Sequence, residues 1–189
     1  MRKWDCRTDR REKVTYSSYA EGTMDSLGVD MRVEFVPMTE KWAREIAAWH
    51  YEGSYSFYDL ENDPEDLREI LDPESWPDHY YAALIEGELV GELYLDLTRG
   101  RMLLGLGLRP DLTGKGLGGE YVKAGMEFSL KKHSFEAFDI LVWEENERAI
   151  RVYQSLGFAL RERRMVDTNG GRFPFLVMSR PAHGSHLSP

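Results

Sequence analysis

The sequence has little that would support an extracellular, membrane-bound or metal-binding protein. Its single cysteine, Cys6, cannot form a disulfide within the chain, and its five histidines show no metal-ligand spacing. No apolar run approaches the roughly 18 residues that a membrane-spanning helix needs. The basic start at residues 1–3 leads into charged residues rather than into the apolar core of a signal peptide. We therefore expect a cytoplasmic protein with no metal site and no membrane contact.

Clustered basic charge is also missing. The net charge is −9 at pH 7, whereas affinity for nucleic acids rests largely on clustered Lys and Arg side chains. The acidic excess is concentrated in residues 31–100, which contain five basic and 17 acidic side chains and so carry a net charge of −12. These counts exclude nucleic acid as the main partner, and they make the middle of the chain the part that would attract a cation.

The domain organisation follows from length and composition. With 189 residues, one composition regime and no internal repeat, the chain fits a single domain. Residues 1–30 mix charged, serine, glycine and tyrosine residues without periodicity, which predicts a disordered N-terminal extension. We expect the folded domain over residues 31–180 and a short polar tail over residues 181–189.

Local patterns predict alternating strands and helices. Thr39 and Asp63 are good helix N-caps, and Pro64 fits the first turn of the second helix. Period-2 alternation in residues 88–97 places Leu89 and Leu93 on one face and Glu92 on the other. The expected strands are 31–36, 79–86, 88–97, 102–108, 138–143 and two strands joined at residues 169–171; the expected helices start near 39, 63, 119 and 146.

A glycine-rich loop separates the strand ending at residue 108 from the next helix. Its sequence, Gly114-Lys115-Gly116-Leu117-Gly118-Gly119, lets backbone N–H groups turn toward an anion such as a pyrophosphate. The spacing Gly114-x-Gly116-x-x-Gly119 also matches the dinucleotide fingerprint, with Glu144 as the ribose-binding acid. However, residues 109–113 separate the loop from its strand, and too little chain follows to complete that fold. No Gly-Lys-Ser/Thr closes a Walker A motif, and a glycine turn without a ligand remains an alternative.

Together with a second motif, this loop resembles the GNAT N-acetyltransferases. Thr113 to Gly118 aligns with the acyl-CoA motif Gln/Arg-x-x-Gly-x-Gly/Ala, and Asn146-x-x-Ala149-Ile150-x-x-Tyr153-x-x-x-Gly157-Phe158 matches a later motif in order and distance. The resemblance extends over the expected domain. It implies a mixed α/β fold in which a central, mostly antiparallel sheet is splayed between its fourth and fifth strands and flanked by about four helices.

The resemblance also implies a set of cofactor-binding residues for acetyl-CoA. Backbone groups around Leu106, Gly107 and Leu108 would pair with the pantetheine arm, and the amides of the glycine loop would hold the pyrophosphate. Thr113 stands where the family usually has Gln or Arg. Lys115 either lends charge to the phosphates or is a solvated loop residue, and Asn146 caps its helix, contacts the cofactor, or does both. The full set is Leu106, Gly107, Leu108, Thr113, Gly114, Lys115, Gly116, Leu117, Gly118, Gly119 and Asn146.

Two residues are candidates for the general acid and the general base of acetyl transfer. The resemblance assigns Tyr153 as the acid that protonates the departing thiolate, and reference pKa values of roughly 10 for Tyr and 8.5 for a thiol fit this role; alternatively Tyr153 is a core aromatic residue. Glu92 or Asp96 could face the acceptor cleft, although a solvated strand face explains them equally well. Glu92 is the candidate base, acting directly or through water. Several relatives have Glu where this chain has Leu141, which argues against acetylation of ribosomal-protein N-termini.

The acceptor is expected to be cationic. Carboxylates flank the aromatic residues of segment 51–58, so this segment offers both negative charge and ring faces to an ammonium group. We select Glu52, Tyr55 and Tyr58 as candidate substrate-binding residues; an acidic, soluble surface with the aromatic residues packed inward is the alternative. The predicted function is direct transfer of an acetyl group from acetyl-CoA to a primary amine: a small molecule, polyamine, aminoglycoside-like compound or Lys-bearing peptide. The protein would be a monomer or homodimer, and the alternative is a non-catalytic acyl-CoA-binding sensor or regulatory module.

Overall fold

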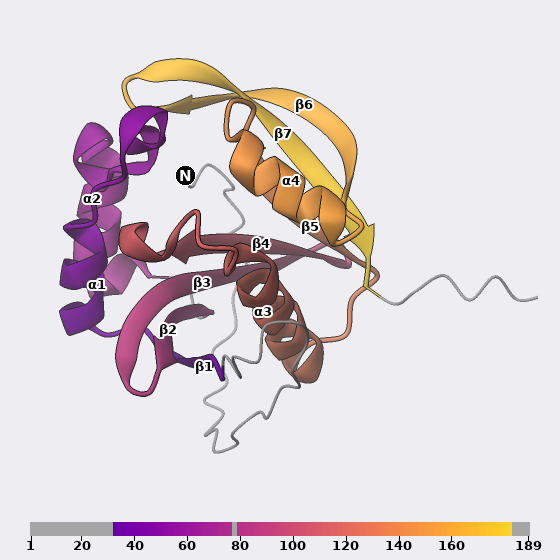
Figure 1. The fold of residues 1–189 in the computed structure, drawn as a ribbon, viewed down its shortest axis with the longest axis horizontal. Helices are drawn as coiled ribbons and strands as arrows, with labels where there is room; N and C mark the ends of the chain where they lie inside the picture. Colours follow the sequence, from indigo (N-terminus) through magenta and orange to yellow (C-terminus); the bar gives the residue numbers. More distant parts are fainter. Residues whose placement is uncertain (1–31, 77–78, 183–189) are drawn as a thin grey trace, which may run out of the picture.

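The computed structural model of the protein describes residues 32–76 and 79–182. In these residues, seven strands form one sheet in the order β1-β2-β3-β4-β5-β7-β6, with helices on both faces (Figure 1). The predicted extension at residues 1–30 lies outside the described residues. The strands are β1 (Glu34–Pro37), β2 (Tyr80–Ile85), β3 (Glu88–Thr98), β4 (Arg101–Leu108), β5 (Ala137–Trp143), β6 (Ala159–Thr168) and β7 (Gly171–Pro181). The helices are α1 (Glu40–Ala47), α2 (Pro64–Leu71), α3 (Gly118–Lys132) and α4 (Glu147–Ser155), with short 3-10 helices η1 (Gly53–Tyr58), η2 (Leu60–Asn62), η3 (Pro73–Ser75) and η4 (Pro110–Leu112).

The helix starts follow the predicted capping residues. The Thr39 hydroxyl accepts a hydrogen bond from the backbone N–H of Trp42 at the start of α1. Asp63 caps α2 by accepting from two backbone N–H groups of its first turn, and Pro64 occupies the first helical position. These two helices therefore begin where the sequence predicts.

The sheet separates between its fourth and fifth strands, as predicted. β4 and β5 run parallel, and in the described chain they pair over only three positions: Arg101 with Ala137, Met102 with Phe138, and Leu103 with Asp139. From position 104 to position 108, β4 no longer pairs with β5. The Arg101 guanidinium bonds to Asp139 at this joint, with Nε 2.6 Å from Oδ2. The open part of the gap is the entrance to the cavity described below.

A bulge in β3 changes one predicted face. Ala83 pairs with Gly91 and Leu84 pairs with Leu89, so Val90 is an extra residue on the β3 side. As a result, Leu89 packs in the core beside α1 and α2, while Leu93 packs in the core beside α3. The prediction that these two leucines share a face was wrong, because a bulge interrupts the alternation that the prediction assumed.

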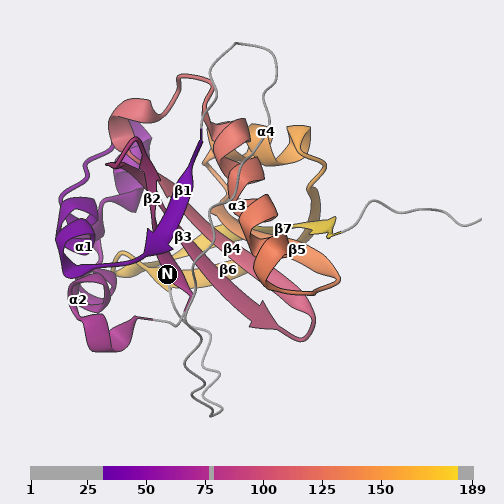
Figure 2. The same cartoon turned by 90° about the horizontal axis from the view of Figure 1, so that it is seen from below.

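The helices cover opposite faces of the sheet. α1 and α2 lie on one face, over a core that includes Ile46, Ile70 and Tyr80, and Figure 2 shows α3 on the other face. The core under α3 and α4 includes Val122 and Phe138 and is the larger of the two. None of the helices in the described part of the chain is long and apolar enough to cross a membrane. Hydrophobic cores therefore pack against both faces of the sheet. The sheet is interrupted only where β4 and β5 separate within the described residues.

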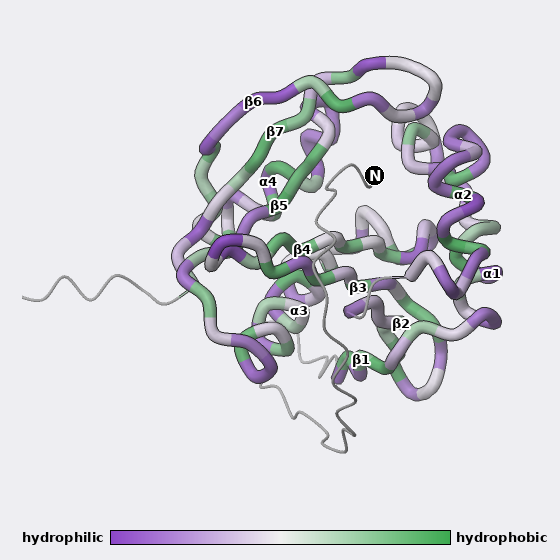
Figure 3. The backbone as a smooth tube through the Cα atoms, turned by 180° about the vertical axis from the view of Figure 1, so that it is seen from behind, coloured by the Kyte–Doolittle hydropathy of each residue, from purple (hydrophilic) through white to green (hydrophobic). Residues whose placement is uncertain are grey.

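The β6–β7 hairpin reaches across the molecule to the start of α2 (Figure 1). Asp63 Oδ2 accepts hydrogen bonds from the Thr168 hydroxyl and from the backbone N–H of Asn169, each 2.9 Å long. Burial alone would raise the pKa of the Asp63 carboxyl, but these two bonds, together with those from the backbone N–H groups of Asp66 and Glu65, lower that pKa. Figure 3 shows β7 as largely hydrophobic and β6, the outer strand, as largely hydrophilic. β7 continues to Pro181, and Ala182 is buried in the main core, so the domain extends past the predicted boundary at residue 180.

Candidate active site

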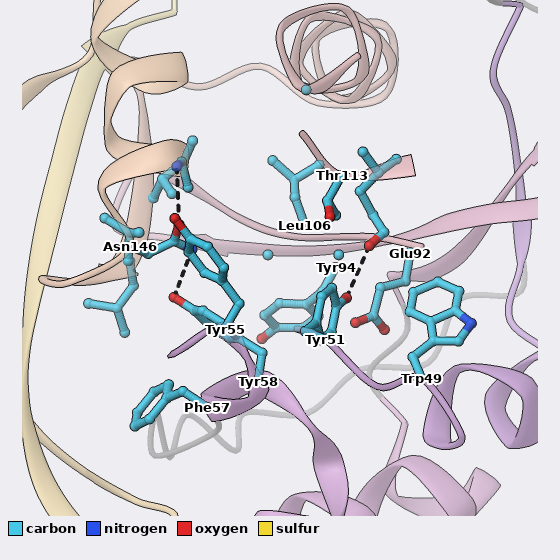
Figure 4. Close-up of a pocket in the computed structure, with 18 of the residues that line it drawn as sticks. Trp49, Tyr51, Tyr55, Phe57, Tyr58, Glu92, Tyr94, Leu106, Thr113 and Asn146 are labelled. Carbon is cyan, nitrogen blue, oxygen red and sulfur yellow. Dashed lines mark hydrogen bonds between the residues drawn. The ribbon is translucent and has the colours of Figure 1, made fainter. Parts of the chain in front are cut away.

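A cavity of about 590 Å³ opens where β4 and β5 separate (Figure 4). Side chains of η1 and α4 line one part of it, and side chains of α1, β2 and β3 line another. Of the predicted site residues, the cavity is lined by Tyr55, Tyr58, Glu92, Leu106, Gly107, Leu108, Thr113, Gly114, Gly116, Gly118, Asn146 and Tyr153. The cavity thus brings together predicted residues from η1, β3, β4, α3 and α4, which are far apart in the sequence.

The glycine loop borders this cavity through a backbone that other residues rarely adopt. Gly114 and Gly116 have φ angles of +74° and +80°, and no atom lies within 4 Å of the position that a Cβ on Gly116 would take. Leu117 is the N-cap of α3 and offers no side-chain acceptor, so the first N–H groups of this helix are not capped by it. Such a loop at a helix start is suited to an anion.

Three residues of the predicted cofactor set do not line the cavity. Lys115 is exposed on the loop, Leu117 turns toward a small depression on the other side, and Gly119 lies within the first turn of α3. The Thr113 hydroxyl donates to the carbonyl of Pro110, 2.7 Å away. This hydroxyl is therefore engaged with the backbone, and the cavity side of the loop is formed by glycines.

Tyr51 is a cavity residue that the site prediction did not select. Its hydroxyl donates to the backbone carbonyl of Leu108, 3.0 Å away, on the open edge of β4. Burial raises the pKa of the Tyr51 phenol, and the negative charge of Glu92 raises it further. The sequence marks segment 51–58 as rich in aromatic residues, but it does not indicate which of its tyrosines reaches β4. Only the folded structure shows that Tyr51 does.

Tyr153 is buried at the cavity, and its ring packs 6.0 Å from that of Phe158. No hydrogen bond from the Tyr153 hydroxyl is formed within residues 32–76 and 79–182. Buried tyrosine hydroxyls usually find a partner. Burial raises the pKa of this phenol, so it stays protonated at neutral pH. The residue is a core aromatic, as one prediction had it, and it also presents a proton without a protein acceptor beside the cavity.

Asn146 and Tyr58 connect η1 to α4. The Asn146 side-chain oxygen accepts from the N–H of Ala149, 3.1 Å away, which confirms the predicted N-cap. Its Nδ2 donates to the Tyr58 hydroxyl at 3.2 Å, and the N–H of Trp143 also donates to that hydroxyl. Burial raises the pKa of Tyr58, although both hydrogen bonds oppose the shift. Tyr58 therefore holds η1 against the sheet.

Glu92 lies on β3 opposite Gly107, facing the side of the cavity that α1 and α2 cover. The Tyr80 hydroxyl donates a hydrogen bond to its carboxylate. A Cβ on Gly107 would lie 2.8 Å from Glu92 Oε1, so only glycine leaves room for this carboxylate beside β4. Trp49 and Tyr51 lie near Glu92 in the cavity (Figure 4). The carboxylate thus faces an aromatic environment rather than a solvated sheet surface.

The acceptor segment is divided between the cavity and the outside. Tyr55 and Tyr58 line the cavity, whereas Glu52 is exposed and does not line it. Asp59 also lines the cavity, but its Oδ1 accepts from the backbone N–H of Tyr51, 2.8 Å away. Ligand atoms of His50, Asp59 and Glu61 lie within 4.8 Å of one another, which is the grouping among the described residues that most resembles a cation site. The structure therefore separates Glu52 from the two tyrosines with which the sequence grouped it.

This combination of a splayed sheet, a glycine loop and a buried tyrosine defines an acyl-CoA-dependent transferase fold. Residues 40–158 match the model of the acetyltransferase (GNAT) family, which is more than half of the chain. The protein belongs to the GNAT acetyltransferase family.

Curated relatives are mycothiol acetyltransferases. The protein from Propionibacterium freudenreichii subsp. shermanii is 31% identical over 104 residues, which cover 55% of this chain and 28% of that protein. The protein from Nocardiopsis dassonvillei is 35% identical over 79 residues, which cover 42% of this chain and 21% of that protein. The chain thus spans about a quarter of the length of the curated relatives that it matches.

Solved structures share the fold at low sequence identity. Spermidine N-acetyltransferase from Vibrio cholerae, in complex with CoA and spermine, has a TM-score of 0.62 and 15% identity, covering 79% of this chain and 95% of that chain. Aminoglycoside acetyltransferase AAC(6')-Ib, in complex with coenzyme A, has a TM-score of 0.60 and 22% identity, covering 82% and 99%. At these identities the likeness shows the fold.

Proposed function

We propose that this protein transfers the acetyl group of acetyl-CoA directly to a primary amine and that cationic amines are its preferred acceptors. The observation that carries the proposal is the Tyr153 hydroxyl, which lies on a buried residue at the cavity and has no partner in the described chain; burial also raises its pKa. A sensor needs no proton donor at this place. The structures of CoA complexes with the same fold support acetyl-CoA as the donor.

The residues of the cavity divide the reaction between them. Acetyl-CoA, when bound, supplies a thioester carbonyl and a thiolate leaving group. Gly114 and Gly116 hold the phosphates through the loop backbone, and the open edge of β4 aligns the pantetheine arm. Glu92 accepts, directly or through water, the proton that the amine loses as its nitrogen bonds to the carbonyl carbon. Tyr153 donates its proton to sulfur as the carbon–sulfur bond breaks.

The acceptor preference rests on the charge around the cavity. Trp49, Tyr51 and Tyr94 offer ring faces, and cation–π contacts are worth about 0.5–2 kcal/mol each. The lining contains the carboxylates Asp59, Asp63, Asp66, Glu69 and Glu92, against two arginines, Arg148 and Arg151. Polyamine-like, aminoglycoside-like or Lys-bearing acceptors fit this surface. Spermine and aminoglycosides are named for proteins of the same fold, which is consistent with it.

A panel of amines with acetyl-CoA tests the function, with products read by mass spectrometry. We expect acetylation of cationic acceptors at higher kcat/KM than of neutral or acidic ones, and an acceptor KM that rises with salt because screening weakens the attraction. Binding of CoA without thiol release above background across the panel would favour the sensor instead. A preference for acidic amines would contradict the acceptor assignment alone.

Replacing Glu92 tests the base. We expect Glu92→Gln to lower kcat/KM for the best amine by about 10- to 100-fold, with partial recovery at higher pH, where more of the amine is already deprotonated. The matched control is Asp96→Asn on the same strand, because Asp96 lies outside the cavity lining and accepts from the Thr98 hydroxyl. The pH profile of kcat/KM is the measurement. Equal losses in both variants would argue against Glu92 as the base.

A further inference from the structure

Arg148 links the glycine loop to the acceptor segment. It lies in the first turn of α4, and its guanidinium carbon is 4.1 Å from the centroid of the Tyr55 ring on η1. Its Nη1 is 3.9 Å from the position that a Cβ on Gly114 would take. Both Arg148 and Tyr55 line the cavity. One side chain therefore contacts the segment that borders one part of the cavity and lies beside the loop that borders another.

Contacts among the described residues do not account for the position of the Arg148 guanidinium. Within the described residues, no hydrogen bond or ion pair to Arg148 is formed, whereas Arg151, one turn later on α4, pairs with Glu147 at 3.0 Å. A positive charge in the first turn of a helix is also disfavoured by the helix dipole. The guanidinium thus lies half-buried at a place where folding provides only a ring contact, which suggests that an anion completes its surroundings.

The position of the Arg148 guanidinium over the Tyr55 ring leaves its hydrogen-bond donors available. A guanidinium contacts an aromatic ring through its flat face, whereas its five N–H groups point outward in its plane. Tyr55 can therefore hold the group while its N–H edge faces the loop at Gly114. Phosphate oxygens match this edge in a bidentate manner. The Thr113 hydroxyl, already bonded to Pro110, does not compete for the same ligand.

We propose that Arg148 binds the pyrophosphate of acetyl-CoA and that Tyr55 positions its guanidinium, so that cofactor binding and the ordering of η1 are coupled. The inference rests on the proposed function, since it takes acetyl-CoA as the ligand of the loop. Coupling is reciprocal: a cofactor that fixes Arg148 also fixes Tyr55, and the acceptor then meets an ordered aromatic segment. The acceptor consequently binds more tightly to the CoA-loaded protein than to the free protein.

Calorimetry with CoA and with 3′-dephospho-CoA tests the phosphate contact. We expect Arg148→Gln to weaken both ligands by the same factor, at least about 10-fold, because the pyrophosphate is common to them. Arg44→Gln is the control for the loss of one positive charge, since Arg44 is exposed, pairs with Glu40 and lies outside the cavity lining. Arg44→Gln should keep CoA affinity within twofold of the wild type.

Two changes at Tyr55 test the positioning. Tyr55→Phe keeps the ring and should keep CoA affinity within twofold, whereas Tyr55→Leu removes the ring and should weaken CoA about three- to tenfold. In the Arg148→Gln background, Tyr55→Leu should have no further effect on CoA affinity. Amide hydrogen exchange supplies a readout without turnover: CoA should slow exchange in residues 53–58 of the wild type and leave it unchanged in Arg148→Gln.

The outcomes separate this inference from the function on which it rests. Wild-type CoA binding together with unchanged affinity in Arg148→Gln would overturn the role of Arg148 alone. A loss confined to CoA, with dephospho-CoA unaffected, would assign Arg148 to the 3′-phosphate and overturn the pyrophosphate contact. Additive effects of the two substitutions would overturn the coupling. Absence of CoA binding to the wild-type protein would overturn the proposed function as well.

Discussion

Replacing Tyr153 with phenylalanine is expected to lower the rate of acetyl transfer by roughly 10- to 1,000-fold, which is the lower part of the range for lost general-acid help. The substitution removes one oxygen that has no hydrogen-bond partner in the described chain, so the ring packing against Phe158 remains. Acetyl-CoA affinity should therefore stay within about threefold, and kcat should carry the loss. Steady-state kinetics with the best amine, together with calorimetry of CoA binding, measure both.

The pH dependence of wild-type kcat is a second measurement that bears on Tyr153. The phenol acts in its protonated form, and burial raises its pKa above the usual value of 10.0, so its ionisation does not reduce wild-type activity at neutral or mildly alkaline pH. Tyr81→Phe is the control, because Tyr81 is buried in the same core and does not line the cavity. It should keep kcat within twofold. Wild-type kcat in Tyr153→Phe would remove the acid assignment and leave Tyr153 as a core aromatic.

Gly116→Val is expected to abolish CoA binding while the protein remains folded. Gly116 has a φ of +80°, where a β-branched residue is strained, and a side chain there would enter the open space that the phosphates need. The strain costs about 1–2 kcal/mol, which a domain of this size tolerates. Calorimetry of CoA binding and thermal unfolding are the measurements.

Gly87→Val is a closely matched control for the strain. Gly87 has a φ of +82° in the β2–β3 turn, and, as at Gly116, nothing lies within 4 Å of its Cβ position. The two valine variants should lose similar stability, but only Gly116→Val should lose CoA. Normal CoA affinity in Gly116→Val would show that the loop does not hold the phosphates.

Local sequence signals predicted the elements of this fold better than their mutual contacts. Thr39 and Asp63 begin helices because an N-cap acts over three or four residues, and such a signal is visible in a single window of sequence. The Val90 bulge is set by the pairing of β3 with β2 and leaves no mark in the alternation itself. The contact of Asp63 with the β6–β7 turn joins residues more than one hundred positions apart, so periodicity carries no information about it.

The same division holds for the candidate site. The glycine loop and Tyr153 were selected from spacing, and the structure places both at the cavity. Glu52 was selected from composition, and it is exposed outside the cavity, because proximity in sequence does not fix the direction of a side chain. Arg148 lies within a recognised motif, yet its contact with Tyr55 depends on how η1 folds back across the sheet.

The short pairing between β4 and β5 joins the two parts of the sheet at one end of β4 only. The two parts of the sheet are held together at positions 101–103, where the buried Asp139 receives Arg101, and they part over the next five residues of β4. Five residues of strand extend roughly 17 Å, so a rotation of about 5° at the joint would change the width of the far end by about 1.5 Å. A change of that size is comparable to the difference between a close and a loose contact with a bound ligand. Away from the Arg101–Asp139 joint, hydrogen bonds from Thr168 and Asn169 to Asp63 also connect the two parts. The width of the cavity mouth therefore depends on contacts at both ends of the gap, and Arg101 and Asp139 act on it from outside the cavity lining.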